Sequence, residues 1–137
     1  MMNALKNFFF YGYVFTLIIA GIWGAFWGAK LDHEILFSLK IESLQDKTAA
    51  SLLSQYRFLR IIEFGFGLSV LKFRKEIFRN VVINRGFLSI MLLGVLTRLY
   101  SLIIDGIPNP VFYFFAVFEL VGVIILYIYS RNMIETM

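Results

Sequence analysis

Long apolar stretches alternate along the chain with short polar segments. Four stretches, at about residues 5–29, 51–73, 86–105 and 111–130, are each long enough to cross the ~30 Å hydrocarbon layer of a bilayer as a helix. Backbone polar groups must be satisfied within the segment in lipid, which favours helices. The pattern therefore predicts an all-α fold: a polytopic membrane protein with a four-transmembrane-helix bundle as the single domain of residues 1–137.

The polar segments mark the boundaries of these helices. Residues 30–45 interleave charged and apolar side chains, which is typical of a short amphipathic helix at the membrane interface. His33, the only histidine, is expected to be solvated there, more than to act as a ligand or proton carrier. Asp46 or Thr48 can cap the next helix, which has no proline or obvious stop before Phe78.

Three glycines mark one face of the first helix. Gly21, Gly24 and Gly28 recur at helical spacing and make a shallow groove where another helix can approach closely. Helix packing is a better explanation of this stripe than a ligand site.

Composition and charge exclude several classes of protein. The chain is 60% hydrophobic and only 16% charged, unlike a soluble domain, and it has no cysteine for disulfides or thiolate metal sites. Its net charge of +4 comes from basic residues that flank the apolar stretches, so we expect a lipid bilayer and no nucleic acid as its partner. Because basic residues cluster between Lys72 and Arg85 and are absent from the loop before Val111, both termini and the 72–85 loop are predicted to be cytoplasmic.

The charged residues inside the apolar stretches are the candidate functional residues of the chain. At 1.5 Å per residue, four of them fall near the bilayer midplane: Arg60, Glu63, Arg98 and Glu119. Arg57 and Asp105 lie nearer the outer interface. Charge in lipid is costly unless it is paired or faces a cavity. We therefore expect the four midplane residues to form one connected cluster, and all six to line a candidate ligand site.

Two functions remain open for this cluster. In the first, Arg60 and Arg98 clamp a small anionic or amphiphilic ligand that the protein binds or transports, with the glutamates setting the charge. In the alternative, a structural or interaction bundle, the ion pairs only fix helix register and assembly. Four helices are few to surround a transport pathway, so transport would favour a homo-oligomer. No catalytic residues, metal site or cofactor are predicted, and an enzyme is the less favoured class.

Several motifs resemble a known family. The runs YRFLR, FGFG, GVLTRLYSLIIDGIPNP and FELVG are similar to an uncharacterised family of small four-helix bacterial membrane proteins, a domain of unknown function. The resemblance covers residues 51–122 and implies a bacterial inner-membrane location. It also implies recurring residues that match Arg60, Arg98, Asp105, Gly106 and Glu119. The chain departs from that pattern at Phe64 and Gly65, where paired glycines are expected, and Arg57 and Glu63 are not carried over.

Overall fold

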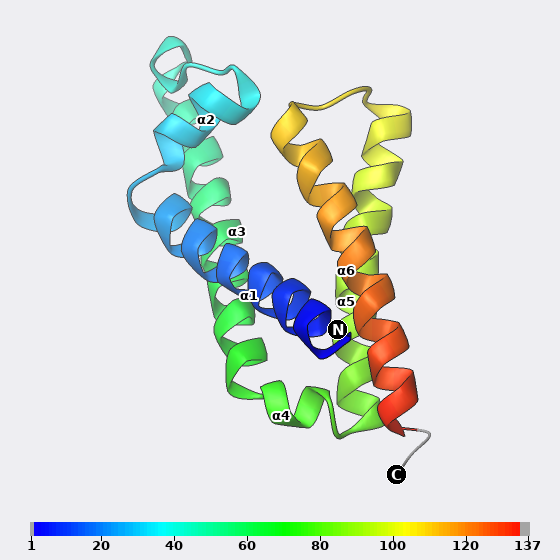
Figure 1. The fold of residues 1–137 in the computed structure, drawn as a ribbon. Helices are drawn as coiled ribbons and strands as arrows, with labels where there is room; N and C mark the ends of the chain where they lie inside the picture. The colour runs from blue at the N-terminus through cyan, green and yellow to red at the C-terminus, as the bar shows by residue number, and fades with distance from the viewer. Residues whose placement is uncertain (1, 135–137) are drawn as a thin grey trace. The chain divides into compact units, whose positions relative to one another are not determined.

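The structure, a computed structural model, describes residues 2–134 and the side chains of residues 2–131. The described residues form helices joined by short turns and no strand, which confirms the all-α prediction (Figure 1). The elements in chain order are α1 (Met2–Phe26), α2 (Ala29–Phe37), a 3-10 helix η1 (Ile41–Ser43), α3 (Asp46–Lys72), α4 (Arg74–Ile77), α5 (Val81–Ile104) and α6 (Pro110–Ile134).

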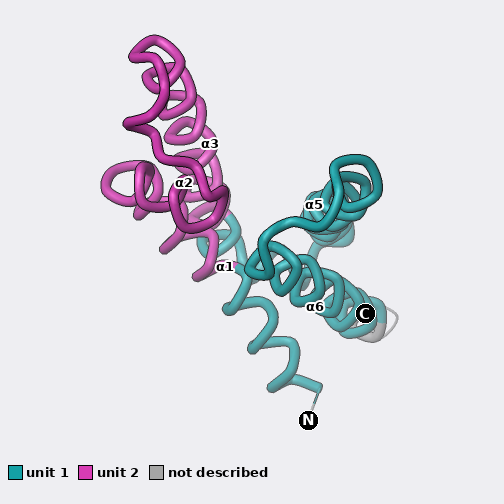
Figure 2. Tube along the Cα trace, turned by 90° about the horizontal axis from the view of Figure 1, so that it is seen from above, with its two compact units in different colours: residues 1–13, 70–137 teal, residues 14–69 magenta. Residues whose placement is uncertain are grey.

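The helices belong to two compact units, drawn in different colours in Figure 2. The central unit is residues 14–69, which comprise the second half of α1, then α2, η1 and most of α3. The terminal unit comprises the described residues of the two chain ends, 2–13 and 70–134, with α4, α5 and α6. Each unit has its own packing.

The terminal unit is a hairpin of α5 and α6 with the start of α1 packed against it. Its fully buried side chains are apolar, with Met91 2% and Leu126 0% exposed. Phe10 adds an aromatic contact, with its ring centroid 5.9 Å from that of Phe87. Burial of such side chains is the main stabilising term in a soluble core, while close packing takes over that role in lipid. This core holds α5 and α6 side by side.

The helix before this hairpin is interrupted, although the sequence predicts a continuous helix to Phe78. That prediction is wrong: α3 ends at Lys72, and the single turn α4 follows. The turn places Ile77 in the core, where it is 3% exposed and its carbonyl accepts a 2.9 Å hydrogen bond from Asn84. The long helix therefore ends without a proline, just before a turn that is anchored in the hairpin.

The third apolar helix begins earlier than its apolar stretch suggests. The Asn80 side chain accepts hydrogen bonds from the backbone nitrogens of Val82 (2.9 Å) and Ile83 (3.2 Å). An asparagine in this position satisfies two of the amides that a helix start leaves unpaired. The helix therefore starts at Val81 and not near Gly86.

The central unit packs α1 on α3 through glycine. A Cβ added at Gly21 would lie 2.7 Å from the backbone nitrogen of Phe64, and one at Gly24 would lie 2.8 Å from Cγ of Arg60. The predicted groove is confirmed for these two positions. Gly28 lies beyond the end of α1, where an added Cβ would collide with the Trp23 ring.

The segment of residues 30–45 contains a helix, as predicted, but its histidine is not solvated. His33 on α2 is 3% exposed, and its Nδ1 donates to the carbonyl oxygen of Ala29 over 2.6 Å. Its ring also lies edge-on to Tyr56 of α3, with centroids 4.6 Å apart. The expectation of a solvent-facing His33 is wrong because α2 folds back onto α3.

Three of the described helices are long and apolar enough to cross a membrane: Met2–Phe26, Val81–Ile104 and Pro110–Arg131. This composition indicates a membrane protein. The 27 residues of α3 would span ~40 Å, but charged residues lie along it. The α3 helix is therefore long enough to span a membrane, but it is less apolar than the three candidate spans.

Candidate functional site

Two of the predicted site residues form an ion pair on α3. Arg60 Nη1 donates to Glu63 Oε2 over 2.7 Å, and Arg60 Nε donates to the Tyr56 hydroxyl over 2.8 Å. The spacing of three and four residues places all three side chains on one face of the helix. The Arg60 side chain is 17% exposed and that of Glu63 is 40% exposed. The arginine is therefore the more enclosed partner.

The hydrogen bonds continue from Tyr56 to α2 and α1. The Tyr56 hydroxyl donates to Asp32 Oδ2 over 2.7 Å, and Trp23 Nε1 donates to Asp32 Oδ1 over 3.3 Å. One polar chain thus connects Trp23, Asp32, Tyr56, Arg60 and Glu63 within the central unit. Asp32 was not among the predicted site residues, because nothing local in the sequence pairs it with a tyrosine on another helix.

Arg57 takes a different direction from Arg60. Its Nη1 donates to the carbonyl oxygens of Ala25 (3.1 Å) and Phe26 (3.4 Å). These carbonyls belong to the last turn of α1, which has no intrahelical donor for them. Arg57 therefore closes the end of α1, and a role in ligand binding stays a prediction.

The second ion pair lies in the terminal unit and connects two helices. Arg98 Nε donates to Glu119 Oε2 over 3.0 Å, and Arg98 Nη2 donates to Oε1 over 3.4 Å. The Arg98 side chain is 36% exposed and that of Glu119 is 13% exposed. Two parallel bonds between a guanidinium and a carboxylate fix the relative rotation of α5 and α6.

Asp105, the last of the predicted site residues, is engaged locally. Its Oδ2 accepts a 2.7 Å hydrogen bond from the Ser101 hydroxyl, and its backbone forms the C-terminal cap of α5. The residue that follows, Gly106, has φ +98°, a conformation that side chains rarely adopt. Asp105 and Gly106 together end the helix and begin the turn to α6.

The six predicted residues are thus distributed over both units. The described contacts give an Arg60–Glu63 pair in the central unit and an Arg98–Glu119 pair in the terminal unit. A connection between the pairs, and with it the single four-residue cluster, stays a prediction. Within residues 2–134 no group of three or more metal-ligating side chains is close enough to hold an ion.

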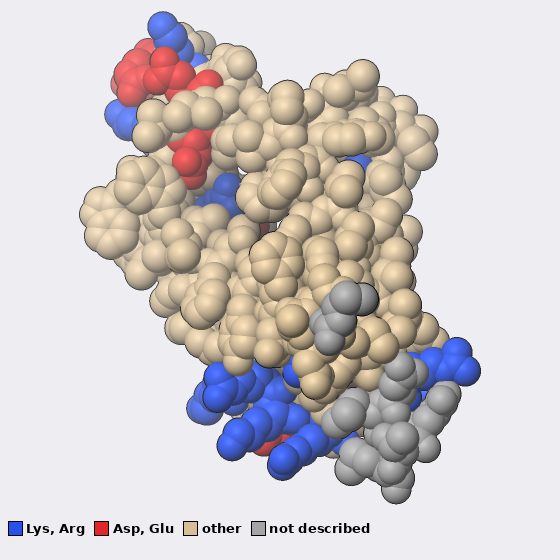
Figure 3. All heavy atoms as spheres, in the orientation of Figure 1, with Lys and Arg blue, Asp and Glu red and all other residues tan. Residues whose placement is uncertain are grey.

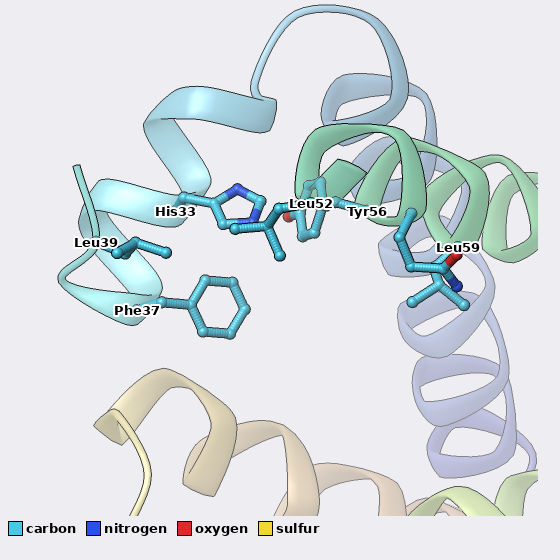
Figure 4. Close-up of a pocket in the computed structure, with 7 residues that line it drawn as sticks. His33, Phe37, Leu39, Leu52, Tyr56 and Leu59 are labelled. Carbon is cyan, nitrogen blue, oxygen red and sulfur yellow. The ribbon is translucent and has the colours of Figure 1, made fainter. Parts of the chain in front are cut away.

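An apolar pocket of about 290 Å³ lies beside the polar chain of the central unit. Figure 4 shows Phe37 and His33 of α2 on one side and Leu52, Tyr56 and Leu59 of α3 on the other. The Tyr56 ring is a wall of this pocket, while the hydroxyl on the same ring is bonded to Asp32 and Arg60. Sequence reasoning missed the pocket, since it depends on how α2 folds back.

Fold and site together define a helical, membrane-associated protein with two Arg–Glu ion pairs on its long helices. A family model described as "Domain of unknown function (DUF4345)" matches residues 5–130. The chain belongs to this family, as the resemblance of its motifs predicts. Comparisons with curated proteins and with solved structures gave no match.

Proposed function

We propose that the chain is a four-span integral membrane protein of the bacterial inner membrane, with α3 as the fourth span. The contacts of α3 support this assignment. Glu63 and Tyr56 bind the Arg60 guanidinium, and Arg57 binds carbonyl oxygens of α1. Paired and hydrogen-bonded charges enter a membrane at much lower cost than isolated ones.

The proposed topology places both termini and the α4 region in the cytoplasm. It is tested with single cysteines at Asn109 and Arg79, since the chain has no cysteine of its own. A membrane-impermeant maleimide added to the outside of intact cells should label the first and not the second. Labelling of the Asn109 position from the cytoplasmic side only would contradict the topology.

We further propose that the central unit binds a small anionic or amphiphilic ligand. One observation carries this proposal: the Tyr56 side chain lines the apolar pocket and also accepts a hydrogen bond from Arg60. An amphiphile needs an apolar pocket for its tail and a cation for its head, side by side. Arg60 uses Nε and Nη1 in the described contacts, and its Nη2 donates to no residue in the part of the chain that is described. That edge of the guanidinium is available to a carboxylate or phosphate.

Binding of dodecanoate and dodecanol to the protein in zwitterionic nanodiscs tests this proposal, because the two probes share a tail and differ in head charge. Arg60→Gln should weaken dodecanoate binding roughly tenfold and leave dodecanol unaffected. Leu52→Trp, which fills the pocket, should weaken both. Lys47→Gln is the control: it removes a cation from α3 away from the pocket and should change neither. Unchanged dodecanoate binding by the Arg60 variant would contradict the proposal.

A second candidate function, a structural or interaction bundle, is favoured by one observation in the terminal unit. Arg98 and Glu119 bind each other through two hydrogen bonds across α5 and α6. A pair of this geometry sets helix register without any ligand. The two functions therefore divide between the units: ligand binding at Arg60, and register at Arg98.

A further inference from the structure

A second pocket, of about 260 Å³, lies at one end of the α5–α6 hairpin. Two helices contribute its lining: Asn84, Arg85 and Leu88 from α5, and Tyr127, Ser130 and Arg131 from α6. Figure 3 shows Lys and Arg side chains gathered around α4 and the adjoining ends of α5 and α6. The pocket thus lies at the basic end of the terminal unit.

The inner wall of this pocket is fixed without a ligand. Asn84 and Ser130 are 4% and 3% exposed. Asn84 Nδ2 donates to the Ser130 hydroxyl over 2.8 Å, and that hydroxyl donates to the carbonyl of Leu126 over 2.7 Å. Such a satisfied network makes a rigid wall, so the pocket keeps its shape when it is empty.

The outer part of the pocket carries two cations on different helices. Arg85 and Arg131 are both exposed. Among the described residues none accepts a hydrogen bond from the Arg85 guanidinium, whereas Arg60 and Arg98 have carboxylate partners. Two guanidinium groups that flank one pocket match the geometry and the charge of a phosphate group.

The position of the pocket along the helices favours the phosphate group of a lipid over a soluble phosphate. Two of the three candidate membrane spans meet at this end of the hairpin. The α5 span begins here, at Val81, and the α6 span ends here, at Arg131. Leu88 continues the lining one turn further into the apolar part of α5. A ligand here therefore meets cations at the interface and hydrocarbon beside them, as a phospholipid does.

We propose that this pocket is a site for the phosphate headgroup of an anionic phospholipid, held between Arg85 and Arg131, with its acyl chains along the apolar surface of the hairpin. The proposal rests on the membrane crossing of α5 and α6 and does not depend on ligand binding at Arg60. Phosphatidylglycerol is the probe, and phosphatidylcholine, whose headgroup carries no net charge, is its reference. Cation pockets between membrane helices at the cytoplasmic side are suited to anionic lipids.

The experiment measures the ratio of phosphatidylglycerol to phosphatidylcholine retained by the whole chain from mixed nanodiscs, by native mass spectrometry. The double change Arg85→Gln and Arg131→Gln should lower this ratio roughly tenfold. The control, Lys75→Gln with Arg79→Gln, removes two cations from the same end outside the pocket and should lower it less than about twofold. Equal losses in the two variants would overturn the proposal, because a general surface field would then explain the preference.

Two further measurements keep the result interpretable. Both arginines are exposed, so the variants should melt at the wild-type temperature in uncharged detergent; if the double variant melts early, Arg85→Gln alone is measured and should still lower the ratio. Inorganic phosphate and glycerol phosphate are then added in excess as competitors. Retention of the lipid supports a phospholipid site, whereas displacement by either would overturn it in favour of a soluble phosphate. The cysteine-labelling result separates either failure from an error in topology.

Discussion

The helices pack against one another differently in the central unit and in the terminal unit. In the central unit, glycines bring the backbones of α1 and α3 together, and a Cβ at Gly21 would lie within 3 Å of backbone atoms. In the terminal unit, large side chains such as Phe10 and Met91 fill the space between helices, and a Cβ at Gly12 would meet only the end of the Phe118 ring, at 2.9 Å. Close backbone contact leaves the central unit less tolerant of added volume.

The polar side chains of the two units differ in the same sense. Five side chains of the central unit form one hydrogen-bonded chain from Trp23 to Glu63, whereas Arg98 and Glu119 of the terminal unit bind only each other in the described contacts. The hydrogen bonds of a connected network strengthen one another, so a change at one position affects the others. An isolated pair couples two helices and no more. The difference supports the proposal that the central unit binds the ligand and that the ion pair of the terminal unit sets helix register.

The largest expected effect comes from adding one methyl group to each unit. Gly21→Ala should lower the free energy of unfolding in mild detergent by about 2–3 kcal/mol, because its Cβ would lie 2.7 Å from the Phe64 nitrogen. Gly94→Ala on α5 has nothing within 4 Å of the added Cβ and should be neutral or slightly stabilising. If the two substitutions cost the same, the contrast in packing is wrong.

Breaking the isolated ion pair should have the next largest effect. Arg98→Met and Glu119→Gln should each cost about 2 kcal/mol of unfolding free energy, because each leaves an unpaired partner in apolar surroundings. The double variant should recover about 1 kcal/mol of the summed loss, since neither partner then remains alone. Melting curves of the three variants measure this coupling. Additive losses would show that the two side chains act separately and would remove the register role.

These contrasts separate what the sequence could predict from what it could not. The spacing of Gly21 and Gly24 predicts a helix-packing face, because helical periodicity is local information. The pairing of Arg60 with Glu63, three residues apart, is local in the same way. The cap at Asn80 is local information as well, but the apolar pattern predicts that this helix starts near Gly86.

The other missed features depend on tertiary contacts. Tyr56 binds Asp32 across 24 positions only because α2 turns back over α3, and the same turn buries His33. Depth in a bilayer fixes the height of a side chain and not the direction in which it points. Arg57 and Arg60 lie within one turn of each other, yet one binds the end of α1 and the other binds Glu63.

A smaller effect should follow from removing the central link of the polar chain. Tyr56→Phe keeps the wall of the pocket and deletes the hydroxyl that joins Asp32 to Arg60, at a cost of about 1 kcal/mol in unfolding free energy. If the network positions Arg60, the same variant should also weaken dodecanoate binding while dodecanol binding is retained. Tyr13→Phe in the terminal unit is the control and should not change dodecanoate binding. Equal dodecanoate affinity of the Tyr56 variant and the wild type would show that the chain does not position the arginine.

The smallest effect concerns the surface of the central unit, where Lys30 Nζ lies 3.1 Å from Glu42 Oε1. A backbone hydrogen bond and then the hydrogen bond and charge of Lys30 lower the pKa of Glu42 from its ordinary value of 4.5. A carboxyl whose pKa is lower in the folded state stabilises that state above pH 4.5, and the contribution disappears as the pH falls through the lowered pKa. The melting temperature of the wild type should therefore approach that of Glu42→Gln on acidification, with a small gap at neutral pH because the pair is exposed to water. A gap between the two melting curves that persists or widens below the lowered pKa would show that the carboxylate charge is not what stabilises this corner of the fold.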